Sequence, residues 1–314
     1  MLYDLIIVGA GPAGVSAAIY AARQKNNFLL ISREMGGQIA KKAVDIENYL
    51  GFNKISGPDL IKTFEEQLKI NEVEVVFDEV MKVSAQGGPA SGGEKYKFLI
   101  ETALGGKYES RAIIVATGAN PRPLGAEGED NFIGKGVSYC SLCDGPIFRN
   151  KTVAVIGGGN AGFETALFLS NYVKKIYILE FGSVLKADNE NKELLEKTGK
   201  AEIITNAKVL KIEGDKFVSS LTYQDLILKE NKKLSVEGVF IEIGNTPATA
   251  FVKDLVDFSE TKEIITDLET YATKTPGLFA AGDCNKGKYK QIVAAAGEGA
   301  KAMLAVYDYL LKNK

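Results

Sequence analysis

The chain has 314 residues, 46% of them hydrophobic and 25% charged, a composition typical of a globular enzyme with room for two domains. Its formal net charge of −2 argues against general binding to nucleic acid, and no apolar run reaches the roughly 20 residues that span a bilayer. Histidine is absent, which excludes imidazole catalysis, and three cysteines without histidine disfavour a structural zinc site. The first residues lack the basic region of a signal peptide, so we expect a cytoplasmic protein.

A glycine turn near the N-terminus gives the first functional signal. An apolar strand is predicted at 5–8, the sequence GAGPAG follows at 9–14, and a helix is predicted at 15–23. In a dinucleotide-binding unit the first glycine permits the tight turn, the second admits a pyrophosphate, and the third lets the helix pack closely. The alternative is a turn that serves packing alone. The predicted binding residues here are Gly9, Gly11, Pro12, Ala13 and Gly14.

Further elements follow in chain order. Apolar spacing predicts a strand at 28–31 and an amphipathic helix at 58–70, and alternation predicts strands at 72–83 and 96–102. The glycine-rich stretch 86–93 is predicted to be a loop. Another buried strand is predicted at 111–118.

The sequence CSLCD places Cys140 and Cys143 in a Cys-x-x-Cys pair followed by Asp144. Such a pair can be half of a zinc site, but the other half has no ligands here, and a reducing cytosol disfavours a purely structural disulfide. We therefore expect a redox-active dithiol. Asp144 is the candidate acid/base because no histidine exists, and the alternative is a carboxylate that caps a turn.

The strand–turn–helix pattern recurs at 153–170, so the chain contains two predicted dinucleotide sites. Counting 23 residues from the first glycine of each turn reaches Ser32 in the first unit and Glu180 in the second. An acid at this place usually binds the ribose hydroxyls, and the alternative is that Glu180 points to solvent. The predicted contacts of the second site are Gly157, Gly159, Asn160, Ala161, Gly162 and Glu180.

The rest of the chain completes the domain prediction. Further strands are predicted within 202–243, and another strand, ending in Gly-Asp, is predicted at 277–283. An alanine-rich helix is predicted at 291–310. Two crossovers, near 114–120 and 242–248, join the halves. We therefore expect an α/β fold with two Rossmann-like domains, the second inserted into the first.

Together these motifs resemble the low-molecular-weight thioredoxin reductase family of flavoproteins, in the family's order and over nearly the whole chain. The resemblance implies a homodimer, an FAD-binding domain at 1–113 and 248–314, and an NAD(P)-binding domain at 114–247 that carries the dithiol. It also implies that Cys143 faces the flavin and that Cys284 is structural beside it. The further FAD contacts that it implies are Gly37, Gln38, Asn48, Thr117, Gly118, Gly282, Asp283, Gln291 and Ile292.

One departure bears on the choice of nucleotide. NADPH-dependent members carry a His-Arg-Arg-x-x-x-Arg cluster after the second unit's strand, whereas this chain has EFGSVLKAD from Glu180 to Asp188. In this respect it resembles the NADH-using flavoprotein subunit of alkyl hydroperoxide reductase, without that protein's N-terminal domain. We therefore expect NADH to be preferred over NADPH, with Glu180 on the ribose hydroxyls.

The expected function is electron transfer from NADH through FAD and the dithiol to a thioredoxin- or glutaredoxin-like protein, which could in turn serve a peroxiredoxin. A ferredoxin–NADP reductase of the same fold is a rival, but such proteins lack the Cys-x-x-Cys pair. Two more hypotheses stay open at this point: a family member that uses neither nucleotide efficiently, and a non-catalytic flavoprotein redox sensor.

Overall fold

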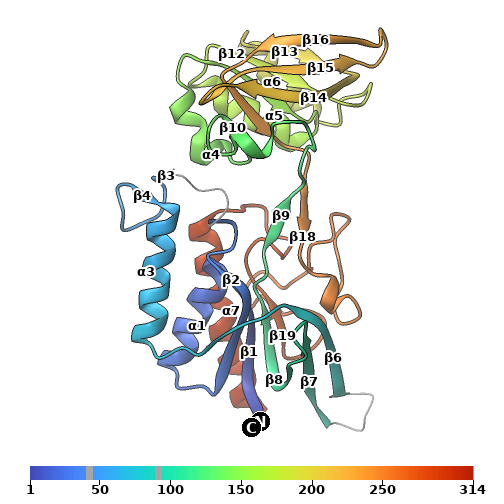
Figure 1. Ribbon diagram of the computed structural model, residues 1–314. Helices are drawn as coiled ribbons and strands as arrows, with labels where there is room; N and C mark the ends of the chain where they lie inside the picture. The colour runs from blue at the N-terminus through green and yellow to red at the C-terminus, as the bar shows by residue number, and fades with distance from the viewer. Residues whose placement is uncertain (40–44, 89–93, 314) are drawn as a thin grey trace. The chain divides into compact units, whose positions relative to one another are not determined.

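A computed structural model describes residues 1–39, 45–88 and 94–313, which form two compact units (Figure 1). The first unit combines the N-terminal residues with Glu47–Asn120 and the segment from Thr246 onward, and the second comprises Pro121–Asn245 together with the described residues Asp45 and Ile46. The second unit is thus inserted into the chain of the first. We expected the first boundary after residue 113, but strand β8 (Lys107–Val115) continues through this point in the first unit's sheet.

The main sheet of the first unit has the order β5-β2-β1-β8-β7-β6, and β19 also pairs with β8. Strands β5, β2, β1, β8 and β19 run parallel to one another, whereas β7 pairs antiparallel with β8 and β6 pairs antiparallel with β7. The strands are β1 (Leu2–Ala10), β2 (Phe28–Met35), β5 (Val75–Phe77), β6 (Val80–Gly88), β7 (Glu94–Thr102) and β19 (Leu278–Ala280).

Two of these strands are longer than the sequence predicted. Strand β2 continues past residue 31, so Ser32 lies inside it, where its hydroxyl accepts a hydrogen bond from the Ala10 amide at 3.0 Å. Strand β6 extends to Gly88, which corrects the loop predicted at 86–93; residues 89–93 lie outside the described part of the chain.

Among the helices whose bounds the structure describes, those of the first unit are α1 (Pro12–Arg23), α3 (Gly57–Ile70) and α7 (Ile292–Lys312). Helix α1 packs against both others, and Figure 1 shows the three together beside β1 and β2. The approach of α7 is close, because a Cβ added at Gly299 would collide with the carbonyl oxygen of Ala13. Buried on both faces, β1 is a continuous apolar run in which Leu5, Ile6 and Ile7 have no exposed surface.

The second unit has a five-stranded parallel sheet of order β10-β17-β11-β12-β13 and a three-stranded antiparallel sheet, β14-β15-β16. Its strands are β10 (Val137–Ser138), β11 (Thr152–Ile156), β12 (Lys175–Leu179), β13 (Ala201–Ile204), β14 (Ala207–Gly214), β15 (Val218–Asp225), β16 (Glu230–Ser235) and β17 (Gly238–Ile241). Its helices are α4 (Ser141–Asp144), α5 (Asn160–Ser170) and α6 (Asn189–Lys197).

The remaining elements in the described residues are short. The strands are β3 (Asp45–Ile46), β4 (Ile55–Ser56), β9 (Ala119–Pro121) and β18 (Asn245–Pro247), and the 3-10 turns are Asp130–Phe132, Gly145–Phe148 and Ala250–Val252. Strands β9 and β18 pair where the chain passes between the units. None of the helices in the described residues combines the length and the apolar composition that crossing a bilayer requires.

Candidate functional site

The first glycine turn joins β1 to α1 and is open only at its middle glycine. A Cβ at Gly9 (φ +107°) would collide with the carbonyl oxygen of Ala116, and one at Gly14 would collide with that of Gly9. No described atom lies within 4 Å of a Cβ placed on Gly11, which precedes α1 and offers no capping side chain. The helix N-terminus therefore presents free backbone N–H groups to a space that fits a pyrophosphate.

Two glycines predicted from other segments lie at this same turn. A Cβ on Gly37 would be 3.6 Å from the Gly11 Cα, and one on Gly282 would be 3.1 Å from the Cβ of Ala13. Both glycines have positive φ angles, +56° and +77° respectively, that favour glycine. Segments far apart in sequence therefore meet around the turn.

The polar residues predicted to contact FAD occur in pairs. The Gln38 side-chain amide donates to the Asp283 carboxylate at 3.1 Å, and that of Asn48 donates to the Gln291 side chain at 3.3 Å. Burial raises the pKa of Asp283 above its usual value. Gln291 immediately precedes Ile292, the first residue of α7. This donor and acceptor set, beside the open turn, fits a dinucleotide such as FAD.

Thr117 and Gly118 have a different environment. The Thr117 hydroxyl donates to the carbonyl oxygen of Ala248 at 2.7 Å, and the Ala248 amide donates to the Gly118 carbonyl at 3.1 Å. Gly118 has a φ of +67°. These bonds tie the two crossover segments to each other.

Sequence reasoning missed the residues that support Gly282 and Asp283. The Glu298 carboxylate accepts hydrogen bonds from the Gly282 amide and the Asn285 side chain, both at 2.7 Å. Lys290 forms a partly buried ion pair with Glu263 at 3.0 Å. Glu298 lies seven residues into α7, and no local pattern marks it as a partner of the Gly-Asp segment.

The second glycine turn repeats the geometry of the first. A Cβ at Gly157 (φ +124°) would collide with the carbonyl oxygen of Glu242, and one at Gly162 would collide with that of Gly157. No described atom lies within 4 Å of a Cβ on Gly159, which precedes α5. Asn160, the first residue of α5, donates to the Asp188 carboxylate at 2.8 Å. This turn therefore also fits a pyrophosphate at a helix N-terminus.

Glu180 directly follows β12 and is held against this turn. Its carboxylate accepts hydrogen bonds from the Gly158 amide at 2.6 Å and the Gly182 amide at 2.8 Å. The Gly158 carbonyl in turn accepts from the amides of Lys186 and Ala187, at 2.9 and 3.1 Å. The alternative that Glu180 points into solvent is therefore wrong.

The dithiol lies on the one-turn helix α4, where Cys140 and Cys143 form a disulfide with Cα atoms 5.3 Å apart. The Cys143 amide also donates to the Cys140 sulfur at 3.2 Å. Asp144 ends α4, and its carboxylate accepts a hydrogen bond from the Ser138 hydroxyl at 2.6 Å. The Ser138 hydroxyl oxygen accepts from the Cys140 amide at 3.1 Å, so Asp144 and the dithiol share one hydrogen-bonded group.

A second carboxyl group is connected to the same helix. Ser141, between the two cysteines, is hydrogen-bonded through its hydroxyl to that of Thr165 at 3.1 Å, and Thr165 donates to the Glu242 carboxylate at 2.8 Å. Burial, helped by the charge of Glu164 and opposed by the hydrogen bond from Thr165, raises the pKa of Glu242 from 4.5 to about 7. The sequence marks Glu242 only as the single acid in the apolar run VFIEI at 239–243, and it is not among the predicted site residues.

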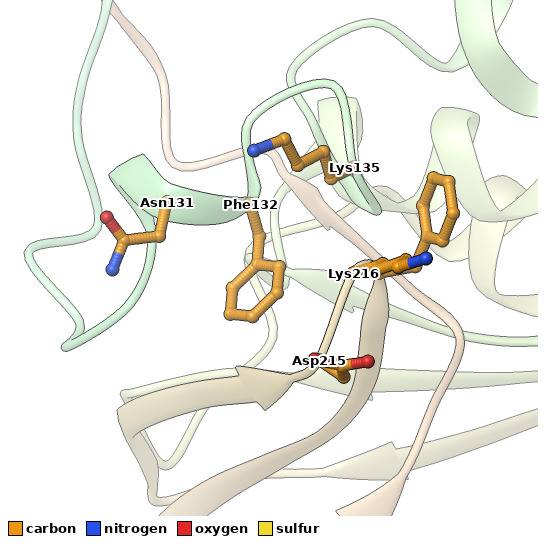
Figure 2. A pocket seen from close by; sticks show the side chains of 6 residues that line it. Asn131, Phe132, Lys135, Asp215 and Lys216 are labelled. Carbon is orange, nitrogen blue, oxygen red and sulfur yellow. The ribbon is translucent and has the colours of Figure 1, made fainter.

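The second unit also has an open hollow of about 620 Å³ that contains none of the predicted site residues (Figure 2). Side chains from the turn around Phe132 and from the β14–β15 connection line it. Because it includes neither the glycine turn nor the dithiol, it plays no part in the candidate site.

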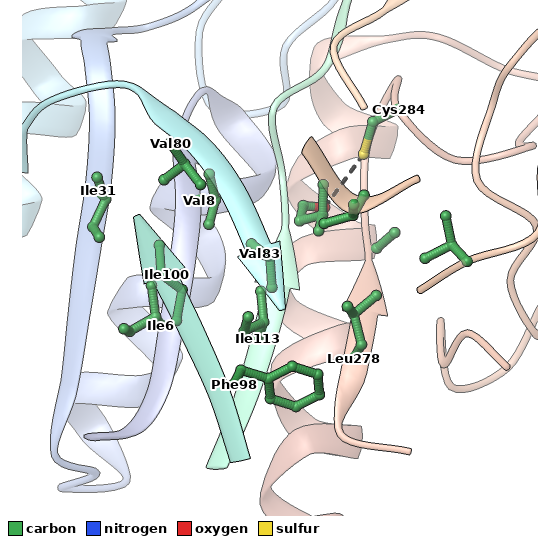
Figure 3. Close-up of a cluster of buried hydrophobic side chains, with 14 of the residues drawn as sticks. Ile6, Val8, Ile31, Val80, Val83, Phe98, Ile100, Ile113, Leu278 and Cys284 are labelled. Carbon is green, nitrogen blue, oxygen red and sulfur yellow. Dashed lines mark hydrogen bonds between the residues drawn. The ribbon is translucent and has the colours of Figure 1, made fainter. Parts of the chain in front are cut away.

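Cys284 lies in the core of the first unit (Figure 3). It has no exposed surface, and its thiol donates to the carbonyl oxygens of Val115 and Ala281, each at 3.3 Å. Burial raises the pKa of this thiol to about 12, so the nucleophilic thiolate is scarce at neutral pH. These contacts support the structural role expected for Cys284.

Comparison with known proteins gives consistent matches over nearly the whole chain. A family model described as "Pyridine nucleotide-disulphide oxidoreductase" matches residues 3–299. The chain is 41% identical over 317 residues to an alkyl hydroperoxide reductase component of Escherichia coli (strain K12), and 38% identical over 311 residues to a Bacillus subtilis (strain 168) protein named NADH dehydrogenase. Each match covers 99% of this chain and 59% of the relative, so the chain spans about three fifths of the length of these relatives.

Solved structures show the same likeness. Thioredoxin reductase from Streptococcus pyogenes MGAS5005 superposes with a TM-score of 0.90 at 35% identity, and the match covers 99% of both chains. The α/β fold with two Rossmann-like domains, expected from the two glycine turns, is thereby confirmed.

Proposed function

Because the chain belongs to the pyridine nucleotide-disulphide oxidoreductase family, we propose that it is an NADH-dependent protein-disulfide reductase that uses FAD. Electrons would pass through the Cys140–Cys143 pair to a thioredoxin- or glutaredoxin-like protein, and from there to a peroxiredoxin. The observation that carries this proposal is that the second unit contains both a disulfide and a glycine turn with open space that fits the pyrophosphate of a nucleotide. A homodimeric assembly, implied by the family resemblance, is part of the proposal.

The first unit would hold FAD through its open turn. Gly11 and Gly37 leave room for the pyrophosphate, and Asp283 and Gln38 supply the polar contacts beside it. When bound, FAD supplies the conversion of a hydride, delivered by a nicotinamide, into an electron pair that a disulfide can accept.

The two cysteines and Asp144 would carry out the thiol exchange and the proton transfer. Reduction breaks the Cys140–Cys143 bond, and the thiolate that forms attacks the partner's disulfide through a mixed disulfide. Asp144 would exchange the proton of the departing sulfur, because its carboxylate and the Cys140 amide share the Ser138 hydroxyl. Cys143 would be the sulfur that faces the flavin.

The preference for NADH over NADPH would be set by the carboxylate of Glu180. Its carboxylate, fixed by two amides beside the second turn, can accept hydrogen bonds from both ribose hydroxyls of NADH. A 2′-phosphate would place a charge of roughly −1.5 to −2 against it. The following segment, 181–188, offers no arginine, and Lys186 is a single exposed cation. A penalty of about 2.7 kcal/mol gives roughly a hundredfold preference for NADH.

Anaerobic titration of the purified protein tests the proposed reaction. Denaturation should release FAD, NADH should bleach the flavin absorbance, and a thioredoxin-like substrate should restore it. The Cys140→Ser and Cys143→Ser variants should each lose disulfide reduction while flavin reduction by NADH survives. Cys284→Ala is the matched control and should keep both half-reactions. Single cysteine variants that still reduce the substrate at wild-type rates would rule out the relay.

Steady-state kinetics test the nucleotide preference separately. The ratio of kcat/KM for NADH to that for NADPH should be roughly one hundred, and Glu180→Arg should lower it by at least tenfold. Glu190→Gln, an exposed acid in the first turn of α6, is the control and should leave the ratio unchanged. A wild-type ratio near one would refute the role given to Glu180.

A further inference from the structure

A hydrogen-bonded chain through two buried hydroxyl groups leads from the dithiol helix to the partly buried Glu242. The Thr165 hydroxyl donates its proton to the Glu242 carboxylate at 2.8 Å, so its oxygen is free to accept the proton of the Ser141 hydroxyl at 3.1 Å. Ser141 and Thr165 are both buried, with 8% and 6% of their surface exposed. The chain thus has a defined direction, from α4 through α5 to the carboxyl end of β17.

The charged groups around this chain are few. Glu164, an exposed residue beside Thr165 on α5, acts on Glu242 by repulsion. On α4, Asp144 accepts from Ser138, and after β12, Glu180 is bound by two amides. Among the described residues no cation forms an ion pair with Glu242. Its charge is therefore compensated by hydrogen bonding alone.

We propose that Glu242 is the proton-accepting partner of the Cys140–Cys143 pair, coupled to it through the hydroxyls of Thr165 and Ser141. Because Glu242 touches neither sulfur, it is a positioning residue rather than a catalytic one. This inference rests on the proposed redox role of the dithiol.

Reduction breaks the S–S bond with two electrons, and one proton binds one sulfur to give a thiol. The other sulfur keeps its electron pair as a thiolate. Where Glu242 is ionised it takes up the second proton, and where it is already protonated that proton goes to solvent. The driving force is repulsion, since a new negative charge on a sulfur beside Ser141 raises the proton affinity of the Glu242 carboxylate, and the Ser141 hydroxyl is two hydrogen bonds from that carboxylate. On oxidation of the dithiol by the partner's disulfide, Glu242 releases that proton.

The affinity of Glu242 for protons suits this role. A pKa of about 7 leaves the group half-ionised near neutral pH, where a modest change in its surroundings moves the largest fraction of a proton. An exposed glutamate, fully ionised at this pH, would give no such response. The two groups would titrate as a coupled pair.

The test uses the flavin-containing protein and dithiothreitol, without nucleotide. Carbon NMR of the Glu242 carboxyl group should give a titration midpoint in the reduced protein about one pH unit above that in the oxidised protein. Proton uptake on reduction at pH 7, followed with an indicator dye in weak buffer, should fall by roughly 0.4 proton per disulfide in Glu242→Gln. Glutamine keeps the shape and can still accept from Thr165, so a purely structural role would leave proton uptake unchanged.

Glu164→Gln is the matched control. Removing this neighbouring charge should lower the Glu242 midpoint in both redox states by the same amount and leave their difference intact. Equal midpoints in oxidised and reduced wild-type protein, or unchanged proton uptake in Glu242→Gln, would overturn the inference. Because dithiothreitol replaces NADH, a protein inactive with NADH would contradict the proposed function and leave this test decisive.

Discussion

Alanine substitutions at two glycines of the second turn should separate folding from nucleotide binding. Gly162 lies inside α5, where an added Cβ would collide with the carbonyl oxygen of Gly157. Helix α5 cannot shift freely to relieve this clash, because Phe163, Ala166 and Leu169 on the same helix are completely buried. Gly159 lies one residue before the helix, at an ordinary extended φ of −91°, with open space in front of it.

The magnitudes follow from these surroundings. Overpacking against an immobile backbone costs about 3 kcal/mol, and alanine's better helix propensity returns about 1, so Gly162→Ala should lose about 2 kcal/mol of unfolding free energy. Gly159→Ala should stay within about 0.5 kcal/mol of wild type, because nothing described obstructs its methyl group. That methyl would stand where a pyrophosphate approaches, so the KM for NADH should rise at least about tenfold.

Urea unfolding followed by circular dichroism measures the first effect, and stopped-flow reduction by NADH measures the second. The reasoning is refuted if Gly162→Ala is as stable as wild type. It is equally refuted if Gly159→Ala folds normally and binds NADH with unchanged affinity, since the open space would then have no role in binding.

Three further predictions concern buried groups. The raised pKa of Glu242 means that its favourable contribution to stability is complete below pH 4.5 and is lost as the pH rises to about 7. This loss amounts to at most about 3 kcal/mol, and urea titrations at several pH values should show it flattened in Glu242→Gln. Cys284 should resist alkylation by iodoacetamide at pH 8 in the folded, dithiothreitol-reduced protein, and modification as fast as at Cys140 would contradict its burial. Glu129 accepts from the Leu124 and Gly125 amides at 2.9 and 2.7 Å, so Glu129→Gln should lose about 1–3 kcal/mol in urea unfolding, whereas exposed Glu127→Gln should change stability little.

The local parts of the site could be predicted from the sequence because each rests on near neighbours in the chain. Gly157 and Gly162 are required because they contact each other within one turn. The spacing from Gly157 to Glu180 is set by one helix, α5, and one strand, β12. The domain boundary at residue 113 was misplaced because an apolar strand does not reveal how far its hydrogen bonds continue. Its last residues, up to Val115, still pair with β1.

Partners that only tertiary folding brings together could not be predicted in this way. Thr165 lies 24 positions from Ser141 and 77 from Glu242, and no periodicity relates them. The contact of Glu298 with Gly282 likewise depends on how α7 packs in the first unit. Short polar side chains such as Ser141 look like surface or turn residues until their burial is known.

The close packing of α1 against α7 has a consequence for biosynthesis. The N-terminal turn leaves the ribosome early, but Gly299, which packs against Ala13, emerges 286 residues later. At roughly 5–20 residues per second this gap lasts from about 15 seconds to a minute, during which the face of α1 that packs against α7 is translated but uncovered. The inserted unit, which occupies the continuous stretch Pro121–Asn245, can fold in that interval. The early segment would then depend on chaperones until the last helix emerges.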